Sequence, residues 1–250
     1  MKLTAVVIAF NEERNLPACL ESLRFCDEVV VVDSRSGDRT AELARAAGAE
    51  VIVKDWPGHI EQKNFALQQG KGEWLLSLDA DERVTPELRA QIQSALAAPG
   101  DRDGFSMPRL SNYLGRWIRH CGWYPDRKLR LVRRGRGTWG GINPHDQLRV
   151  PGPVGRLTGD LEHYPYKDLS DHLRKIDSYT TIIAGEKRKR GQGALPMLVL
   201  AAPAKFLKAY VLKAGFLDGW QGLVVAVLGS YYDFLKYAKL YELERNDRSA

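Results

Sequence analysis

The sequence predicts an α/β fold in which a mostly parallel sheet is flanked by helices and followed by a C-terminal helical extension. Three continuous apolar runs rich in β-branched residues, at 3–10, 28–32 and 50–53, have the composition of strands buried on both faces. Helical patterns separate these runs. The alternation of strand and helix is typical of a parallel sheet with right-handed crossovers.

Each predicted helix carries a start or stop signal. The helices are expected at residues 16–23, 40–47 and 59–69, and from Thr85-Pro86-Glu87 onward. Asn11 or Asn15 is placed to cap the first helix, and a glycine follows the second and the third. Thr at the cap, Pro at the first position and an acid in the first turn favour a helix start in the fourth. A strand at 73–78 lies between the last two helices.

The pattern changes after residue 104, where short strand-like pieces alternate with loops rich in Gly and Pro. The pieces lie at 104–108, 128–132 and 147–150, and a helix is predicted over 169–185. The last segment, 195–240, is apolar and aromatic and is punctuated by lysines. We therefore expect a second half of different architecture and a helical tail.

Composition indicates a globular protein with a basic surplus. The 250 residues are 44% hydrophobic and 27% charged, with a net charge of +6. Basic residues gather at 102–136 and 187–190, which favours phosphates, nucleic acid or an acidic membrane surface as partners. The three cysteines lack metal spacing and are expected to be reduced, with a Cys19–Cys26 pairing left open. No cleavage signal follows the first apolar run, and no uncharged run reaches the about 20 residues of a membrane span, so a cytoplasmic protein is expected.

An acidic motif ends the fourth apolar run. After residues 74–78 come Asp79, Asp81 and Glu82. Ligands of open α/β sheets bind beyond the carboxyl ends of the strands, and carboxylates there can hold Mg²⁺ together with substrate phosphates. The alternative is a solvated turn in which Asp81 or Glu82 caps the next helix.

Asp33 ends the second predicted strand and has two interpretations. It can accept hydrogen bonds from a nucleotide's base or sugar, or it can belong to a capping loop with Ser36 or Asp38. The chain has neither a G-x-G-x-x-G fingerprint nor a G-x-x-x-x-G-K-[ST] loop, which disfavours typical dinucleotide and P-loop chemistry. A nucleotide would therefore be held by a metal on the acidic motif and by basic side chains.

Four motifs together resemble the GT-A glycosyltransferases of the large inverting family 2. They are Val7-Ile8-Ala9-Phe10-Asn11-Glu12-Glu13, Val30-Val31-Val32-Asp33-Ser34, Gln62-Lys63-Asn64 and Leu78-Asp79-Ala80-Asp81-Glu82. Residues 122–131 and 143–146 and the tail look like a subgroup that contains lipopolysaccharide inner-core β-1,4-glucosyltransferases acting on heptose. One departure is Gly37, which stands where the family's loop usually has Thr.

The resemblance implies a GT-A Rossmann-like fold and a role for each matching residue. Residues 1–100 would bind the nucleotide sugar, 101–180 the acceptor, and 181–250 would form an amphipathic helical region. The implied nucleotide-sugar site comprises Phe10, Asn11, Glu12, Asp33, Gln62, Lys63, Asn64, Asp79 and Ala80. Asp81 and Asp79 would ligate Mg²⁺ or Mn²⁺, which stabilises the charge of the departing diphosphate. His145 is a candidate third ligand, although a lone loop histidine is more often only exposed.

Inversion at the sugar also requires a base for the acceptor hydroxyl, and the family's usual Glu-Asp motif is absent. Asp126, which follows Trp123-Tyr124-Pro125, and Asp146 are the candidates. Asp126 is preferred, against the alternative that it only forms an ion pair with Arg127 or Arg130. The other histidines, among them His163, show no ligand spacing and receive no role.

The resemblance implies transfer of a hexose, expected to be glucose, from a UDP-sugar to a lipid-linked core oligosaccharide. Residues 187–228 then predict peripheral contact with the anionic inner face of the cytoplasmic membrane, the alternative being helices packed on the catalytic domain. A rival reaction is sugar transfer to a polyprenyl phosphate. A nucleic-acid-binding module is disfavoured despite a pI near 9.2, because no binding motif accompanies the basic residues.

Overall fold

The computed structural model describes residues 2–142, 145–195 and 197–249, and the side chains of all of these except 142, 145 and 247–249. The chain forms two compact units. The first consists of Met1–Leu110 and Asp126–Tyr164, and the second of Ser111–Pro125 and Pro165–Ala250. The predicted assignment of binding roles to 1–100, 101–180 and 181–250 stays a prediction, since the two units are defined by packing alone.

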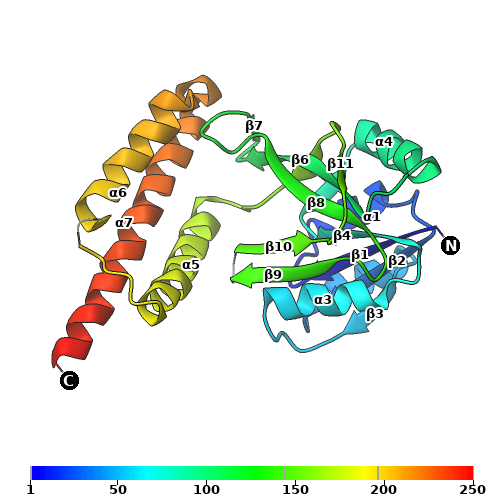
Figure 1. The fold of residues 1–250 in the computed structure, drawn as a ribbon, viewed down its shortest axis with the longest axis horizontal. Coiled ribbons are helices and arrows are strands. Elements are labelled where there is room, and N and C mark those ends of the chain that lie inside the picture. Colours follow the sequence, from blue (N-terminus) through cyan, green and yellow to red (C-terminus); the bar gives the residue numbers. More distant parts are fainter. Residues whose placement is uncertain (1, 143–144, 196, 250) are drawn as a thin grey trace. The chain divides into compact units, whose positions relative to one another are not determined.

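The first half of the first unit alternates strands and helices as predicted (Figure 1). Its elements are β1 (Leu3–Ala9), α1 (Leu16–Ser22), β2 (Glu28–Asp33), α2 (Thr40–Ala46), β3 (Glu50–Val53), α3 (His59–Gln69), β4 (Trp74–Asp79), β5 (Glu82–Val84) and α4 (Pro86–Ala97). β1 pairs in parallel with both β2 and β4, and β2 pairs in parallel with β3. The predicted α/β fold with a mostly parallel sheet is confirmed.

Antiparallel strands extend this parallel sheet. The remaining strands are β6 (Gly104–Tyr113), β7 (Arg116–Ile118), β8 (Asp126–Arg133), β9 (Thr138–Ile142), β10 (His145–Arg149), β11 (Val154–Arg156) and β12 (Leu161–His163). β8 pairs antiparallel with β4 and with β6, giving the order β3-β2-β1-β4-β8-β6-β12-β5. β9 and β10 form a separate hairpin. β5, β7, β11 and β12 have three residues each, too few to show a period in the sequence.

Alternating side chains of the central strands pack into two hydrophobic cores, one on each face of the sheet. Val7 of β1 packs in one cluster with Leu16 of α1 and Leu88 of α4, whereas its neighbour Val6 packs with Ala66 of α3 on the other face. This alternation is the period of two of a β-strand, and it explains the continuous apolar runs. Helices thus cover both faces, and the carboxyl edge of the strands is left for the loops.

One predicted cap forms and one does not. The Thr85 side chain accepts a hydrogen bond from Leu88 N at 3.2 Å, which fixes the start of α4. Asn15 occupies the N-cap position of α1 without a capping hydrogen bond, because its side chain donates to Glu12 Oε2 at 2.9 Å. Asn15 therefore takes the predicted N-cap position, but its side chain makes no capping hydrogen bond, and Asn11 serves the loop described below.

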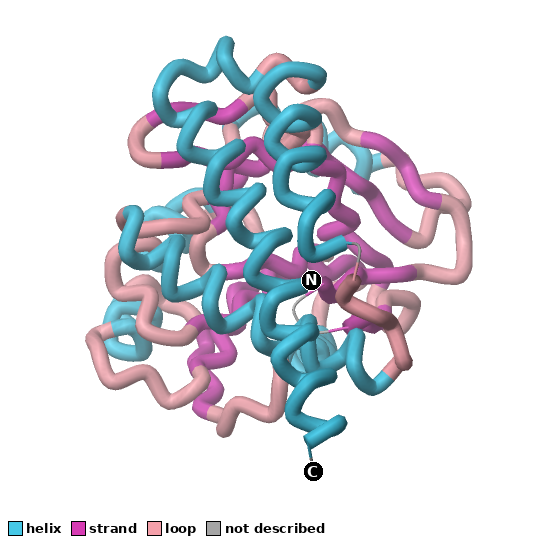
Figure 2. Tube along the Cα trace, turned by 90° about the vertical axis from the view of Figure 1, so that its left-hand side faces the viewer, coloured by secondary structure: helices cyan, strands magenta, loops and turns pink. Residues whose placement is uncertain are grey.

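Helices dominate the second unit. They are α5 (Leu169–Lys189), α6 (Met197–Phe206), the π-helical turn η1 (Leu207–Leu212), the 3₁₀ turn η2 (Gly215–Asp218) and α7 (Gly219–Ser249). α7 packs against both α5 and α6, and the helices lie side by side (Figure 2). The Asp218 carboxylate accepts hydrogen bonds from the backbone N–H groups of Arg119 and His120, at 3.1 and 2.8 Å, which ties η2 to the loop after β7.

No single helix in the described residues is long and apolar enough to cross a membrane. The pair Met197–Leu212 and Gly215–Asn246, bent by 72°, passes the same test of length and composition when taken together. The basic run Lys187–Arg190 forms the end of α5, where cations are favourable beside the helix C-terminus.

Candidate active site

The ends of three neighbouring strands bring the predicted residues to one edge of the sheet. Ala9 of β1 lies opposite Asp33 of β2, and Ile8 lies opposite Asp79 of β4. Phe10 follows β1 directly, and its side chain is 57% exposed. The carboxyl ends of the strands thus place an exposed ring between two carboxylates that are far apart in the sequence.

The loops after β1 and β2 are joined by hydrogen bonds. Asn11, with a positive φ of 55°, accepts from Gly37 N at 2.8 Å and donates its own N–H to Ser36 Oγ at 2.9 Å. The buried Asp33 carboxylate accepts from Ser36 N at 3.0 Å, so it shapes this turn. A Cβ at Gly37 would meet no atom within 4 Å, so a side chain fits where the family usually has Thr.

Glu12 and Asp38 complete the connection between these loops. Glu12 N donates to Thr40 Oγ1 at 2.8 Å, and the Asp38 carboxylate accepts from Thr40 N at 3.0 Å and from Glu13 N at 3.2 Å. Asp38 therefore has the structural role that its position in the loop indicates. The two loops form one hydrogen-bonded rim beside Phe10.

The three consecutive residues of the Gln62-Lys63-Asn64 motif reach four different segments from α3. Gln62 Nε2 donates to Ser34 Oγ at 3.1 Å, which holds the loop after β2. Asn64 exchanges two hydrogen bonds with the backbone of Trp139 on β9, both at 2.9 Å. Lys63 Nζ lies 2.8 Å from Asp146 and 3.0 Å from Asp79. Successive helical residues point about 100° apart, so the three side chains of one motif contact four partners in different directions.

A buried cluster of charges lies beneath the acidic motif. Glu82, which is fully buried, accepts two hydrogen bonds from Arg130, at 3.0 and 2.7 Å, and one from Asp79 N at 3.1 Å. Arg130 also donates to Asp79 at 3.2 Å. Burial alone would raise the pKa of the Asp79 carboxyl, but the cations of Lys63 and Arg130 outweigh it and lower that pKa below its usual range. Asp79 is therefore ionised at neutral pH.

Asp126 lies at the start of β8 in an ion pair with Arg109, whose Nη2 is 2.7 Å away, and with Lys128, whose Nζ is 3.0 Å away. The partners proposed from the sequence, Arg127 and Arg130, are therefore wrong, because β6 presents Arg109 opposite Asp126 in the strand register. Burial opposes ionisation of Asp126, and these two cations nevertheless lower its pKa. The Asp126 side chain is 35% exposed, compared with 9% for Asp146.

Asp81 has a neighbour that sequence spacing did not indicate. His163 Nε2 of β12 lies 3.5 Å from Asp81 Oδ2. Burial alone would raise the pKa of the Asp81 carboxyl, and His163 contributes most to lowering it. β12 pairs with β5, and Tyr164 N donates to the Asp81 carbonyl at 2.9 Å. Strand pairing therefore brings His163 to the motif from 82 positions away.

The two aspartates offer oxygen atoms suited to a hard cation. Oδ1 of Asp81 is buried and has no hydrogen-bond donor, Oδ1 of Asp79 is buried with Lys63 Nζ 3.0 Å away, and Ala80 between them is buried. Carboxylate oxygens are the ligands that Mg²⁺ and Mn²⁺ prefer, so the residues fit such an ion. Among the described side chains, no group of three His, Cys, Asp or Glu is arranged around a metal position. The His145 side chain lies outside the described residues, and its role as a ligand stays a prediction.

Comparison with known proteins agrees with this arrangement. The family model for glycosyl transferase family 2 matches residues 4–144. The chain belongs to glycosyl transferase family 2. It is 33% identical over 255 residues to the lipopolysaccharide core biosynthesis glycosyltransferase LpsC of Rhizobium meliloti, covering 97% of this chain and 93% of that protein.

Solved structures share the GT-A fold of this family 2 glycosyltransferase. The mannosyltransferase PcManGT from Pyrobaculum calidifontis, in complex with GDP-Man and Mn²⁺, has a TM-score of 0.56 at 16% identity, covering 96% of this chain and 87% of that chain. TarS of S. aureus, in complex with UDP-GlcNAc, has a TM-score of 0.52 at 14% identity, covering 100% of this chain and 92% of that chain. The predicted GT-A fold and family 2 membership are confirmed.

Proposed function

We propose that this family 2 glycosyltransferase moves a hexose, expected to be glucose, from a UDP-sugar to a heptose hydroxyl of a lipopolysaccharide inner core, with inversion. The observation that carries the proposal is the pair Asp79 and Asp81 at the end of β4, where the buried Oδ1 of Asp81 has no hydrogen-bond donor. Asp33 ends the strand β2 on the other side of β1. The similarity to LpsC supports the acceptor class. Three details go beyond that similarity and belong to the proposal: heptose as the acceptor sugar, glucose as the transferred sugar, and inversion at the anomeric carbon.

The residues of the chain account for binding and orientation of the donor. Phe10 offers an exposed face for the base, and the loop rim at Asn11 and Asp33 offers polar groups to the nucleoside. A divalent cation held by Asp79 and Asp81 would supply Lewis-acid stabilisation of the leaving diphosphate. Lys63 and Arg130 keep Asp79 ionised and hold it in place. We assign proton removal from the acceptor hydroxyl to Asp126, the more exposed of the two candidate bases.

The test of the donor site is calorimetry of UDP-glucose, UDP-galactose and GDP-mannose, each with and without Mn²⁺. We expect UDP-glucose to bind at least tenfold more tightly with Mn²⁺, because a cation held by Asp79 and Asp81 would offset the repulsion between these carboxylates and the diphosphate. Asp81→Asn should abolish this gain, and it should fold because it removes repulsion from Asp79. Asp101→Asn, an exposed carboxylate away from the motif, is the control. Binding of all three sugars without any effect of metal would contradict the proposal.

We also propose that the second unit rests on the anionic inner face of the cytoplasmic membrane. Many large apolar side chains of this unit are exposed, namely Val199, Leu200, Leu207, Val211, Leu212, Phe216, Leu217 and Trp220. Lys208 and Lys213 lie exposed among them. Apolar side chains beside lysines are typical of helices that lie in the membrane interface and attract acidic lipids.

If the second unit contacts the membrane, we expect the protein to sediment with phosphatidylglycerol vesicles at about 0.15 M salt. At this salt concentration, interactions between exposed charges are screened beyond about 8 Å. The double variant Leu212→Glu, Phe216→Glu should lose most of the bound fraction, because both side chains are more than half exposed and would place charge in the apolar layer. Leu169→Glu, at the start of α5, is the matched control. Equal sedimentation of the wild type with neutral and acidic vesicles would contradict the proposed attraction of the second unit to acidic lipids.

A further inference from the structure

A cavity of about 220 Å³ lies within the second unit. It is enclosed by α5, α6 and η1, α7 and the loop after β7. Six side chains define its chemistry, namely Trp123, Tyr166, Tyr179, Tyr232, Lys175 and Lys205. Ligand sites for drug-sized molecules span about 300–1,000 Å³, so this cavity suits one ring unit and not an extended chain.

The aromatic walls are fixed by packing before any ligand arrives. Tyr166 stacks on His172 at 3.9 Å between ring centroids, and Trp123 lies 6.4 Å from Tyr166. Tyr113 packs edge-on against Trp123 and donates to or accepts from His172 Nδ1 at 2.9 Å. Rings held in this way present a preformed face, which lowers the entropy cost of binding.

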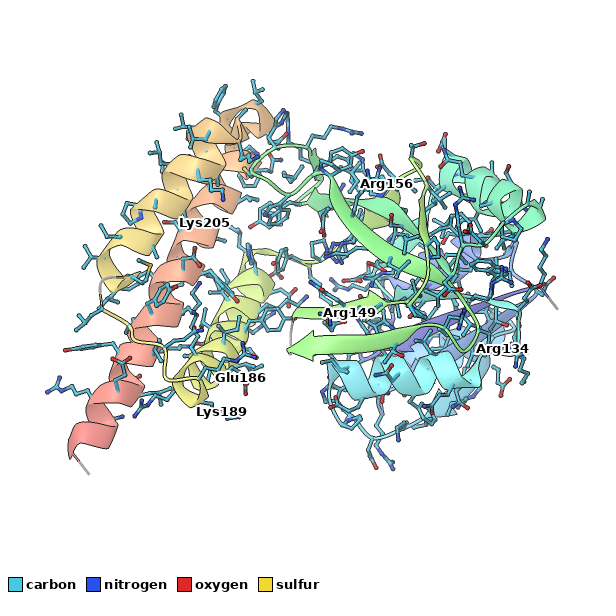
Figure 3. The ribbon with its side chains drawn as sticks, in the orientation of Figure 1. Arg134, Arg149, Arg156, Glu186, Lys189 and Lys205 are labelled. Atoms are coloured by element: carbon cyan, nitrogen blue, oxygen red, sulfur yellow. The ribbon has the colours of Figure 1, made fainter. Side chains whose placement is uncertain are left out.

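Two lysines supply positive charge at this cavity. Lys175 donates to the Pro165 carbonyl at 2.6 Å and pairs with Asp171 at 3.1 Å, which fixes its ammonium group beside Tyr166. Figure 3 labels Lys205, which belongs to α6. Its side chain is exposed, and in the described part of the chain no carboxylate pairs with it. A Cβ at Gly229 of α7 would lie 3.5 Å from Lys205 Cε, so the glycine leaves room for this side chain.

The other titratable groups at the cavity do not cancel this charge. Burial lowers the pKa of His172 to about 4 and raises that of Tyr232 to about 12, so both are neutral at pH 7. The Asp233 carboxylate is paired with Lys236 at 2.6 Å on the same helix. The cavity therefore combines aromatic faces, neutral hydroxyl groups and the free cation of Lys205.

We propose that this cavity binds one acidic sugar residue of the acceptor, a pyranose that bears a carboxylate or a phosphate. The C–H groups of a pyranose face pack on the electron-rich faces of aromatic rings, and the acid group meets Lys205 and Lys175. A purely apolar occupant would cover the Lys205 ammonium group without giving it a partner, which is costly. The proposal rests on the proposed glycosyl transfer, and it assigns the second unit to recognition of the acceptor.

The test is ligand-observed NMR on the full chain with glucuronic acid, glucose 6-phosphate, glucose and inorganic phosphate. We expect the two acidic sugars to bind at least tenfold more tightly than either glucose or phosphate alone. Lys205→Ala should lose this preference and Lys205→Arg should keep it. Lys208→Ala, which removes an exposed lysine that does not line the cavity, is the matched control. Gly229→Leu, which fills the space beside Lys205, should also abolish binding.

Two results would overturn the proposal. One is equal binding of glucose and glucuronic acid, and the other is equal loss in Lys205→Ala and Lys208→Ala. If inorganic phosphate binds as tightly as glucose 6-phosphate, the aromatic rings play no part and the proposal is also wrong. Calorimetry of UDP-glucose with Lys205→Ala separates the two proposals, because donor binding should be unchanged there. Failure of the wild type to bind any nucleotide sugar would remove the proposed reaction without altering the NMR result.

Discussion

Asp126→Asn is expected to lower kcat at least about a hundredfold while leaving UDP-sugar binding unchanged, the loss typical of a missing general base. The amide keeps the shape of the carboxylate and can still contact Arg109 and Lys128, so the fold should persist. It cannot accept the proton of the acceptor hydroxyl. Turnover with a truncated core oligosaccharide and calorimetry of the donor measure the two effects separately.

Asp146→Asn is the comparison for this experiment. Asp146 pairs with Lys63 at 2.8 Å, and Lys63 also contacts Asp79. Removing the charge of Asp146 should therefore change the KM for the donor more than kcat. If Asp126→Asn turned over normally and Asp146→Asn were inactive, the assignment of the base would be reversed.

The pH dependence of kcat gives a further readout of Asp126. Because Arg109 and Lys128 lower its pKa, the carboxylate stays ionised until the pH falls below its ordinary value near 3.8. If Asp126 is the base, we therefore expect no loss of kcat between neutral pH and about pH 5. An acid limb centred near pH 6 to 7 would instead indicate that a histidine accepts the proton.

Glu82→Gln is expected to lower the free energy of unfolding by about 3–5 kcal/mol, the usual cost of removing one partner of a buried ion pair. Glu82 is fully buried and contacts both Arg130 and Arg109. Without the charge of Glu82, Asp79 is the one carboxylate among the described residues that still pairs with the buried Arg130. Urea unfolding followed by circular dichroism measures the change.

The matched control is Glu73→Gln, which lies beside β4 in the same unit. Glu73 pairs with Arg133 at 3.0 Å, but its side chain is 53% exposed, so the loss should stay below about 1 kcal/mol. Combining Glu82→Gln with Arg130→Met should restore part of the stability, because the unpaired buried cation is removed. An unchanged unfolding midpoint in Glu82→Gln would contradict the assigned role of the cluster.

Short-range patterns in the sequence predict the order of the strands and helices in the first hundred residues. The apolar runs became β1 to β4, the Thr85 cap forms, and Asp79 and Asp81 stand at the end of β4. These features depend on neighbours in the chain, since a buried strand and a helix start leave a pattern within a few residues. β5 and β12 left no such pattern, because strands of three residues are defined by the partner they pair with.

The sequence by itself determined the parallel half of the sheet and the position of the acidic motif at its carboxyl edge, because both follow from short-range periodicity. Only the tertiary structure decided which side chains surround that motif. Arg130 contacts Glu82, Lys63 contacts Asp146, and His163 contacts Asp81, each across 48 or more positions. Such contacts are selected by strand pairing and by the cost of burying unpaired charge, and no local pattern in the chain records them.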